Sequence, residues 1–480
     1  MLRPSTGVQF AQVGRWLVLA AIGVSIGAHA QPSATRPPER FAALGREILS
    51  ELIAINSAQS HGSTAAAHAV AARALTAGFS PADVAVLAPA DHPEKGNVVI
   101  RLRGRTHDRP VLYIAHLDVV EARPEDWTVD PFALTERDGW LYGRGTIDMK
   151  GQDAAVLTSL IRLKEEGVVP ARDVIAAFTA DEEAGGSANG VAWLFKEHRD
   201  LVDAALVVNP DGGEAALKQG RRLYVAVQTS EKMFLTFTIE TTDKGGHSSR
   251  PTDANPIYRL AAGLERVAKL TFPVHLTDTT RLYFGRRAET ETGLLRSDMQ
   301  AVLGLPADPA AVDRLSASVE TNIQLRTTCT TTMIEGGHAE NALPQRARAT
   351  VQCRVIPGES PDSIAAALRA ALADPKIAVS VMTPATPAPD SPPTPAVLAM
   401  VEGVARSMWP GVAVLPEMSP GATDSIYTRA LGLPSYGIDG MFDDLDDGRA
   451  HGRDERIGVV AFAEELEFTC RLMRVIADAH

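Results

Sequence analysis

Apolar positions along this chain form two kinds of pattern that alternate with each other. Short, continuous apolar runs rich in β-branched residues are predicted to be strands, at 97–102, 111–115, 173–178 and 204–208. Segments with apolar residues three and four apart are predicted to be helices, at 41–55, 154–166 and 191–198. Because strands alternate with helices, we expect an α/β fold with a mostly parallel sheet covered by helices on both faces.

The pattern changes in the middle of the chain. Polar and apolar residues alternate at 232–240 and 346–355, which is typical of antiparallel strands with one buried face. Helical spacing at 255–270 and 363–373 accompanies them, so a smaller α+β domain is predicted here, while 272–335 is left unassigned. The first pattern then returns as helix, strand and helix at 396–407, 433–438 and 459–477.

The predicted domain organisation is therefore an α/β domain interrupted by an insertion. Its parts are a signal peptide at 1–30, a disordered leader at 31–40, an α/β domain in two pieces at 41–228 and 383–480, and an inserted domain at 229–382. The proline-rich stretch at the start of the second piece is the expected returning linker.

The N-terminus has the features of a secretory signal peptide. Arg3 and Arg15 supply positive charge, 17–27 is apolar, and Ala28-His29-Ala30 fits a cleavage site of small residues. An uncleaved anchor over 16–28 is the alternative, but this apolar core is shorter than a membrane-spanning helix usually is. We expect an exported protein, periplasmic or secreted, without stable membrane insertion after cleavage.

Composition and charge exclude several classes of protein. The 480 residues are 45% apolar and 22% charged, as in globular proteins rather than disordered or fibrous ones. Lys and Arg number 47 against 59 Asp and Glu, so the net charge of −12 argues against a nucleic-acid partner. Three cysteines cannot form a disulfide framework. Cys329 and Cys353 can pair if their flanks form a hairpin, whereas Cys470 has the spacing of a core residue.

Residues capable of catalysis follow the predicted strands. The strand at 111–115 runs into His116 and Asp118, which share a face because side chains two apart on a strand do so. His116 can then ligate a metal while Asp118 accepts the other imidazole N–H and fixes its tautomer.

Three further turns carry carboxylates at similar places. Asp148 lies in a glycine-rich turn before a predicted helix. A phosphate-binding loop is the competing interpretation, but the turn lacks the Gly-Lys-Ser/Thr ending of such loops. Asp181-Glu182-Glu183 follow one strand and Asp211 follows another. A solvated acidic loop is the simpler interpretation of any one turn. Together, however, these turns leave the carboxyl ends of parallel strands, where open α/β sheets bind ligands.

The charges of these residues favour a site for two metal ions. Asp148, Glu183 and Asp211 carry −3 at neutral pH, which two divalent ions and one hydroxide balance, while His116 and His451 stay neutral. A lone late histidine such as His451 is more often structural, but this cluster is short of one nitrogen ligand. Mixed imidazole and carboxylate ligands suit Zn²⁺, with Co²⁺ or Mn²⁺ as substitutes. Glu182 is then free to act as general base.

These motifs resemble those of the co-catalytic di-zinc exopeptidase family. That family includes glutamate carboxypeptidase, aminoacylase-1, carnosine dipeptidases and succinyl-diaminopimelate desuccinylase. The resemblance spans nearly the whole chain from Arg40 and rests on His116-x-Asp118, the turn 143–151, Asp181-Glu182-Glu183 and the late His451. It implies that the two α/β pieces form the catalytic domain and that the inserted domain is a lid and dimerisation domain. It also implies that 272–335 makes this chain one of the longer members.

The resemblance also assigns roles to individual residues. It implies that His116 and Asp211 hold one zinc, that Glu183 and His451 hold the other, and that Asp148 bridges both. Asp118 supports His116, and Glu182 is the general base. Position 211 is Asp, which resembles the peptidase-like members of the family, whereas the acylase-like members have Glu at this position.

Five residues resemble the family's substrate-binding positions: His247, Asn341, Arg354, Gly421 and Thr423. The resemblance implies that His247 stabilises the oxyanion, often across a dimer. Asn341 and Arg354 hold the substrate's backbone and carboxylate, and the loop 421–424 closes the carboxylate pocket. Simpler interpretations stay open, because His247 can cap a turn, Asn341 can belong to a turn, and Arg354 can pair with a surface acid.

The expected function is therefore zinc-dependent hydrolysis of an amide next to a free carboxylate in small peptides, as in a carboxypeptidase or dipeptidase. The alternatives are an N-acyl-amino-acid hydrolase and, in another class, a non-catalytic peptide-binding relative. The presence of the base and all five ligands speaks against the last of these. The expected partners are a small peptide or N-acyl amino acid and, through the lid, a second copy of the chain.

Overall fold

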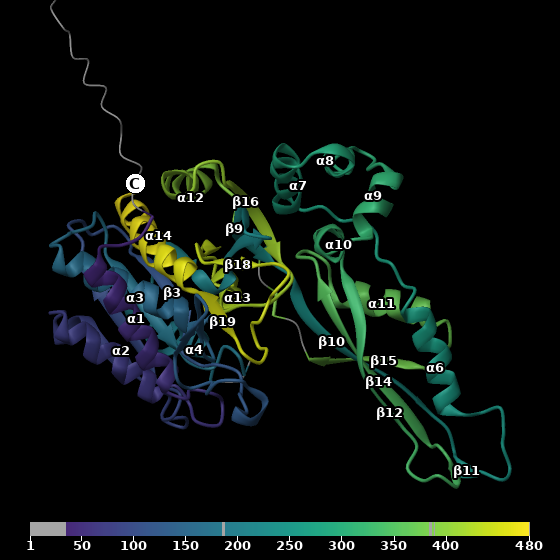
Figure 1. Cartoon of the computed structure of the whole chain (residues 1–480). Helices are drawn as coiled ribbons and strands as arrows, with labels where there is room; N and C mark the ends of the chain where they lie inside the picture. Colours follow the sequence, from purple (N-terminus) through teal and green to yellow (C-terminus); the bar gives the residue numbers. More distant parts are fainter. Residues whose placement is uncertain (1–34, 185–187, 384–385, 388, 480) are drawn as a thin grey trace, which may run out of the picture. The chain divides into compact units, whose positions relative to one another are not determined.

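The computed structural model describes residues 35–184, 188–383, 386–387 and 389–479 (Figure 1). The predicted signal peptide, and the leader as far as residue 34, lie outside these ranges. No helix within the described ranges is both long enough and apolar enough to cross a membrane.

The main sheet is the framework of the catalytic domain. Its strands follow the order β1-β2-β6-β3-β7-β17-β9-β8-β18, with β16 paired to β9. Strands β6, β3, β7 and β17 run parallel at its centre, as the sequence predicts. The strand bounds are β1 Val84–Leu87, β2 Asn97–Leu102, β3 Val111–His116, β6 Val174–Thr179, β7 Leu206–Asn209, β8 Glu214–Lys218, β9 Arg221–Glu231, β16 Ala413–Ser419, β17 Ser435–Ile438 and β18 Phe442–Asp444.

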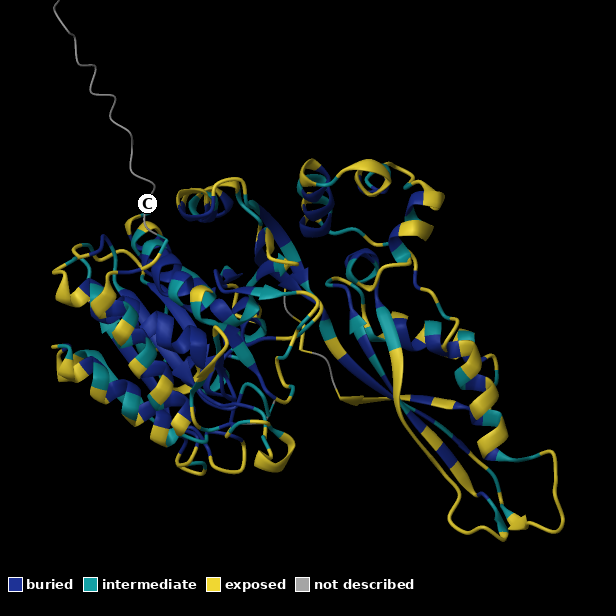
Figure 2. Ribbon diagram, in the orientation of Figure 1, coloured by how far each residue is buried: buried dark blue, intermediate teal, exposed yellow. Residues whose placement is uncertain are grey.

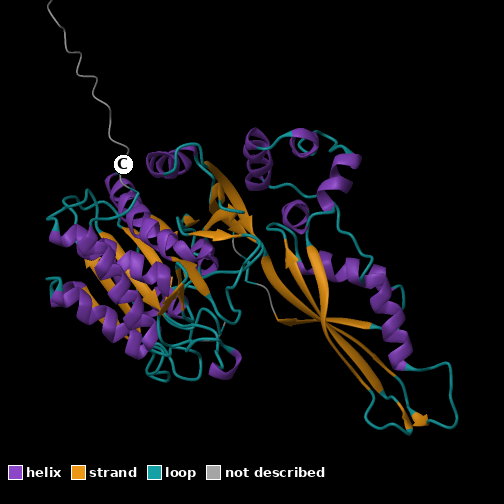
Figure 3. Cartoon of the chain, in the orientation of Figure 1, coloured by secondary structure: helices purple, strands orange, loops and turns teal. Residues whose placement is uncertain are grey.

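Helices cover both faces of this sheet (Figures 1 and 3). Every residue of β3 and β6 is buried, because alternate side chains pack into different cores (Figure 2). Tyr113 and Phe178 belong to one core, and Leu112 and Ile175 to the other. The first core is closed by α1 Glu39–Ala54, α2 Thr64–Thr76, α3 Lys150–Glu165, α12 Pro395–Met408 and α14 Val459–Asp478. The second is closed by α4 Gly190–Glu197, α5 Arg199–Val202 and α13 Ser425–Ala430.

The inserted domain has its own antiparallel sheet and core. The strand order is β12-β14-β10-β15, with β10 Met233–Thr242, β12 Thr328–Gly336, β14 Arg346–Val355 and β15 Ala378–Thr383. Helices α6 Pro256–Val267 and α11 Pro361–Leu372 pack on one face of it. A separate two-stranded antiparallel sheet pairs β11 Gly246–His247 with β13 Ala342–Leu343. Cys329 and Cys353 lie opposite each other on β12 and β14 and form a disulfide, which settles a pairing that the sequence left open.

The stretch that the sequence pattern left unassigned is mainly helical. It contains α7 Asp278–Thr290, α8 Gly293–Ala301, α9 Pro309–Ser316 and α10 Val319–Leu325. Tyr283 and Phe284 of α7 pack with Leu415 of β16 and Ala226 of β9. Part of the range 229–382 therefore packs on the main sheet rather than on the β12-β14-β10-β15 sheet.

A small sheet, β19-β5-β4, lies next to the glycine-rich turn. Its strands are β4 Thr135–Arg137, β5 Trp140–Tyr142 and β19 Arg456–Gly458. The β19–β5 pairing brings the C-terminal segment that follows His451 against the turn that carries Asp148.

Candidate metal centre

Segments distant in the sequence meet at one edge of the main sheet. Strands β6, β3 and β7 are neighbours and run parallel, so the residues that follow them emerge at the same edge. His116 is the last residue of β3, Glu182 and Glu183 follow β6, and Asp211 follows β7. Asp148 lies in the turn that leads into α3.

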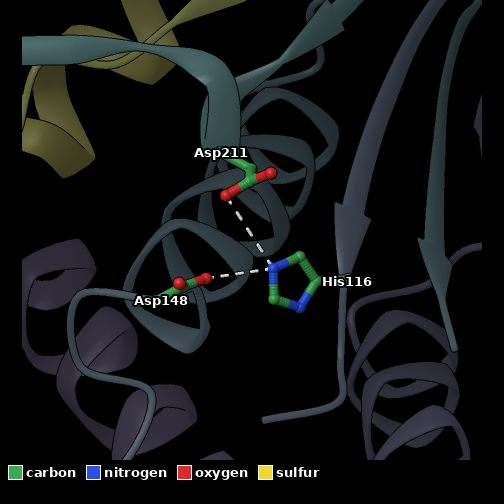
Figure 4. Close-up of side chains that lie close together, drawn as sticks. All are labelled: His116, Asp148 and Asp211. Carbon is green, nitrogen blue, oxygen red and sulfur yellow. Dashed lines mark hydrogen bonds and ion pairs between the residues drawn. The ribbon is translucent and has the colours of Figure 1, made fainter. Parts of the chain in front are cut away.

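These side chains contact one another around Asp148. His116 Nε2 is 3.1 Å from Asp148 Oδ1 and 3.9 Å from Asp211 Oδ1 (Figure 4). His451 Nε2 is 3.0 Å from Asp148 Oδ2 and 2.9 Å from Glu183 Oε1. Asp148 therefore presents one carboxylate oxygen to each imidazole, which is the arrangement that a bridging ligand requires.

Two groups of side chains among the described residues have the spacing of metal ligands. They are His116, Asp148 and Asp211, and Asp148, Glu183 and His451, with the ligand atoms of each group within 4.8 Å of one another. Ligands at about 2.0–2.1 Å from a tetrahedral zinc ion lie about 3.4 Å apart. The distance between His451 Nε2 and Glu183 Oε1 is 2.9 Å, and that between His116 Nε2 and Asp211 Oδ1 is 3.9 Å. These distances lie on either side of the expected separation, so the residues present fit two ions that share Asp148.

The carboxylates at this site favour positive charge on the groups around them. Burial lowers the pKa of His116, but hydrogen bonds with Asp148 and Asp211 outweigh it and raise the pKa well above its usual value. Hydrogen bonds with Asp148 and Glu183 raise the pKa of His451 to about 10. The carboxylates that crowd the two imidazoles thus favour the protonated form of each. Divalent ions supply the same positive charge and leave the imidazoles neutral, as metal ligation requires.

Asp118 supports both His116 and the turn that carries Glu182, the predicted general base. Its carboxylate accepts the backbone N–H groups of Glu182 and Glu183, at 3.2 and 3.0 Å. The Nδ1–H of His116 donates to the backbone carbonyl of Asp118 at 3.0 Å, whereas the carboxylate Oδ1 is 3.8 Å away. The sequence predicted that the carboxylate of Asp118 accepts the His116 Nδ1–H, and this was wrong, because the backbone carbonyl of the same residue accepts it. The carbonyl fixes the same tautomer and leaves Nε2 directed at Asp148.

Glu182 has an environment suited to carrying a proton. Its side chain is half-buried, and the backbone of its turn is fixed by Asp118. Burial raises the pKa of Glu182 well above its usual value, and the charge of Asp211 raises it further. A carboxyl group with a raised pKa can accept and return a proton near neutral pH.

A buried ion pair that the sequence analysis missed joins two of the ligand-bearing turns. Glu455 accepts hydrogen bonds from Arg144 Nη1 at 2.6 Å and from the backbone N–H of Asp148 at 3.1 Å. Arg144 Nη2 in turn donates to the carbonyl of Gly452 at 3.0 Å, beside His451. Both side chains are buried, with exposed fractions of 3% and 0%. The pair therefore fixes the backbone at Asp148 and the backbone beside His451 relative to each other.

The predicted substrate residues lie on the inserted domain and on the loop before α13. His247 and Asn341 are exposed, on and beside the two-stranded β11–β13 sheet, and Ser248 N–H donates to the carbonyl of Asn341. Arg354 is half-buried on β14, with its guanidinium carbon 4.9 Å from the centre of the Phe234 ring. Within the described part of the chain, Arg354 Nη1 is buried without a hydrogen-bond partner, so a carboxylate could still pair with it.

Gly421 and Thr423 belong to a loop with internal support. Glu231, the last residue of β9, accepts hydrogen bonds from both the backbone N–H and the hydroxyl of Thr423. Glu231 also pairs with the buried Arg429 at 3.0 Å, and Gly421 N–H donates to Ser419 Oγ. The polar atoms of Thr423 are thus engaged in holding the loop, and direct substrate binding by Thr423 stays a prediction.

Comparison with known proteins places this site in a family. The model of peptidase family M20/M25/M40 matches residues 112–475, which include every proposed metal ligand. The chain belongs to this family. The M20 relatives include the N-fatty-acyl-amino acid synthase/hydrolase PM20D1 of Xenopus tropicalis, which is 30% identical over 385 residues, covering 78% of this chain and 74% of that protein.

Solved structures of M20 proteins show the same fold. The metallo-carboxypeptidase Sso-CP2 of Sulfolobus solfataricus has a TM-score of 0.67 at 18% identity, covering 91% of this chain and 99% of that one. The Bacillus subtilis YXEP protein, described as a dinuclear metal binding peptidase, has a TM-score of 0.57 at 13% identity, with coverages of 92% and 100%. The α/β catalytic domain with an inserted domain is thus the M20 architecture, as the resemblance in sequence implied.

Proposed function

We propose that this protein is an exported M20 hydrolase that uses two Zn²⁺ ions to cleave a peptide amide next to a free carboxylate. The observation that carries the proposal is the position of Asp148, one oxygen facing His116 and the other facing His451. A carboxylate so shared, with Glu182 near enough to Asp211 and His116 for their charges to act on it, supports hydrolysis by an activated water. Co²⁺ and Mn²⁺ are the expected substitutes, because the ligands are imidazoles and carboxylates.

In the proposed hydrolysis, Glu182 transfers the proton and Asp118 holds Glu182 in position. Two bound divalent ions supply Lewis acidity toward the scissile carbonyl and make water a stronger acid. Glu182 removes a proton from the attacking water as the new C–O bond forms. Glu182 then gives that proton to the amide nitrogen, and the C–N bond breaks to release an amine and a carboxylic acid. Asp118 holds the backbone of Glu182 throughout.

Arg354 supports the preference for a free carboxylate. Its guanidinium lies on the lid sheet over Phe234, and burial lowers its pKa. An arginine with an unpaired buried N–H gains most from an anionic ligand, because a carboxylate both neutralises its charge and accepts its hydrogen bonds. Substrates that carry the carboxylate next to the scissile amide are therefore favoured.

An N-acyl-amino-acid hydrolase is the second candidate. The observation that favours it is the 30% identity to the PM20D1 protein of Xenopus tropicalis, named for N-fatty-acyl amino acids. Both candidates share the free carboxylate and the amide, and they differ in the group on the acyl side. The fold comparison with Sso-CP2 of Sulfolobus solfataricus does not separate them, since it rests on 18% identity.

Export is supported by the disulfide between Cys329 and Cys353, because such bonds persist mainly in oxidising compartments.

Dimerisation through the lid is supported by exposed apolar residues. Ile257 and Tyr258 on α6, and Met333 and Ile334 on the edge strand β12, are exposed. An exposed apolar edge strand is a ready site for pairing with a second chain. Sedimentation of the purified protein, compared with a Met333→Lys variant, tests this expectation.

A substrate panel tests the proposed activity. The metal-loaded protein is given dipeptides and N-acyl amino acids, each with a free and with an amidated C-terminus, with and without chelator. We expect chelator-sensitive cleavage of the free acids alone, and the more rapidly cleaved class identifies the substrate. Glu182→Gln should bind the metal ions but lose nearly all turnover. Equal cleavage of amidated substrates, or full activity in chelator, contradicts the proposal.

A further inference from the structure

A buried lysine lies directly behind the turn that carries the proposed general base. Lys95 Nζ is 2.5 Å from Asp181 Oδ1, and Asp181 immediately precedes Glu182. The exposed fractions of the two side chains are 9% and 5%, so water screens this ion pair little. Of the adjacent acids in this turn, Asp181 is thus paired with a lysine, whereas Glu183 contacts His451.

The backbone at Asp181 adopts a conformation that needs external support. Its φ is +66°, in the left-handed region that residues other than glycine rarely adopt. Neighbouring groups hold the turn on both sides of this residue. Asn97 Oδ1 accepts the N–H of Ala180 at 2.9 Å, and Asp118 accepts the N–H of Glu182 at 3.2 Å. Between these two points, Lys95 holds the side chain of Asp181.

We propose that Lys95 is a positioning residue for catalysis, which holds Glu182 in place through its ion pair with Asp181. The inference rests on the proposed function of Glu182. If Lys95 is removed, a buried carboxylate is left without its partner and moves toward water or another donor. Any such movement rotates the left-handed turn and displaces the next residue, Glu182. Lys95 touches neither a metal ligand nor the expected substrate carboxylate, so its loss should leave binding intact.

Variants at Lys95 test the inference through turnover. We expect Lys95→Met to lower kcat about 100-fold, the usual cost of a small misplacement of a catalytic group, with KM within about twofold and two metal ions still bound. Lys95→Arg keeps the charge and should retain turnover within about tenfold of the unmodified enzyme. The matched control is Lys196→Met, because Lys196 is on the surface with 78% of its side chain exposed.

A double variant separates positioning from general structural damage. If Lys95 acts through Glu182, adding Lys95→Met to Glu182→Gln should lower the residual rate no further. A Lys95→Met enzyme with unchanged kcat overturns the inference, as does a multiplicative loss in the double variant. If Lys95→Met does not fold, Lys95→Arg provides the test instead. A folded Lys95→Arg enzyme whose kcat is about 100-fold lower, although the charge is kept, also overturns the inference. An unmodified enzyme that cleaves nothing in the panel instead overturns the proposed function, and the inference with it.

Discussion

Replacement of Glu455 by glutamine is expected to weaken both the fold and the metal site. Glu455 accepts hydrogen bonds from Arg144 and from the backbone N–H groups of Gly145, Ile147 and Asp148, at 2.6 to 3.1 Å. Glutamine keeps the volume and one acceptor oxygen, but its NH₂ group faces donors. The Arg144 guanidinium then stays buried without an anion.

The structure sets the size of this effect. Breaking a buried ion pair by removing one partner costs about 3–5 kcal/mol, and the retained oxygen places Glu455→Gln at the lower end, at about 3 kcal/mol. The matched control is Glu136→Gln, which breaks an exposed pair with Arg46 whose side chains are 50% and 38% exposed. An exposed pair contributes about 0–1 kcal/mol, so the control should be nearly neutral.

Urea unfolding of the chelator-treated proteins measures both variants without a contribution from bound metal. We expect the midpoint to fall for Glu455→Gln with little change in the slope. Metal analysis of the reloaded protein should show weaker retention, because the backbone of Asp148 and the segment after His451 lose a common anchor. If Glu455→Gln is no more destabilising than Glu136→Gln, the reasoning about this pair is refuted.

Three further predictions follow from other parts of the structure. Arg354→Ala should raise KM for free carboxylates but not for amidated substrates, and an equal rise for both would indicate a structural role. Reduction of Cys329–Cys353, which are 24 residues apart, should lower the free energy of unfolding by about 3 kcal/mol, measured in urea with and without reductant. Burial raises the pKa of Asp439 from 3.8 to about 7, so this acid binds a proton more tightly when folded. Its contribution to stability therefore falls as pH rises from about 4 to about 7, and Asp439→Asn should flatten that slope in urea unfolding across this range.

The clustering of the proposed metal ligands could be predicted from the sequence because most of them follow the ends of parallel strands. His116 and Asp211 each follow a continuous apolar run that is buried on both faces, and such runs are recognisable without a structure. The parallel order of β6, β3 and β7 then brings their carboxyl ends together. His451 follows no such run, and only the need for another nitrogen ligand suggested it.

The supporting residues could not be predicted in the same way. Arg144 and Glu455 are 311 positions apart, and Lys95 and Asp181 are 86 apart, so nothing local marks either pair. A buried charge looks the same as a surface charge in a sequence, and its partner is set by topology. The helices at 278–325 were missed for a related reason. Apart from the strong apolar pair Tyr283 and Phe284, their buried face includes polar residues such as Arg287.

Titration of the metal-free protein with Zn²⁺, while hydrolysis of a free-carboxylate substrate is followed, tests the central claim most directly. The account predicts that full activity requires two ions per chain. It also predicts that Glu182→Gln binds both ions yet stays inactive, and that His451→Ala loses one ion preferentially. Full activity with one ion, or two tightly held ions in His451→Ala, would contradict a centre in which Asp148 bridges two metal ions.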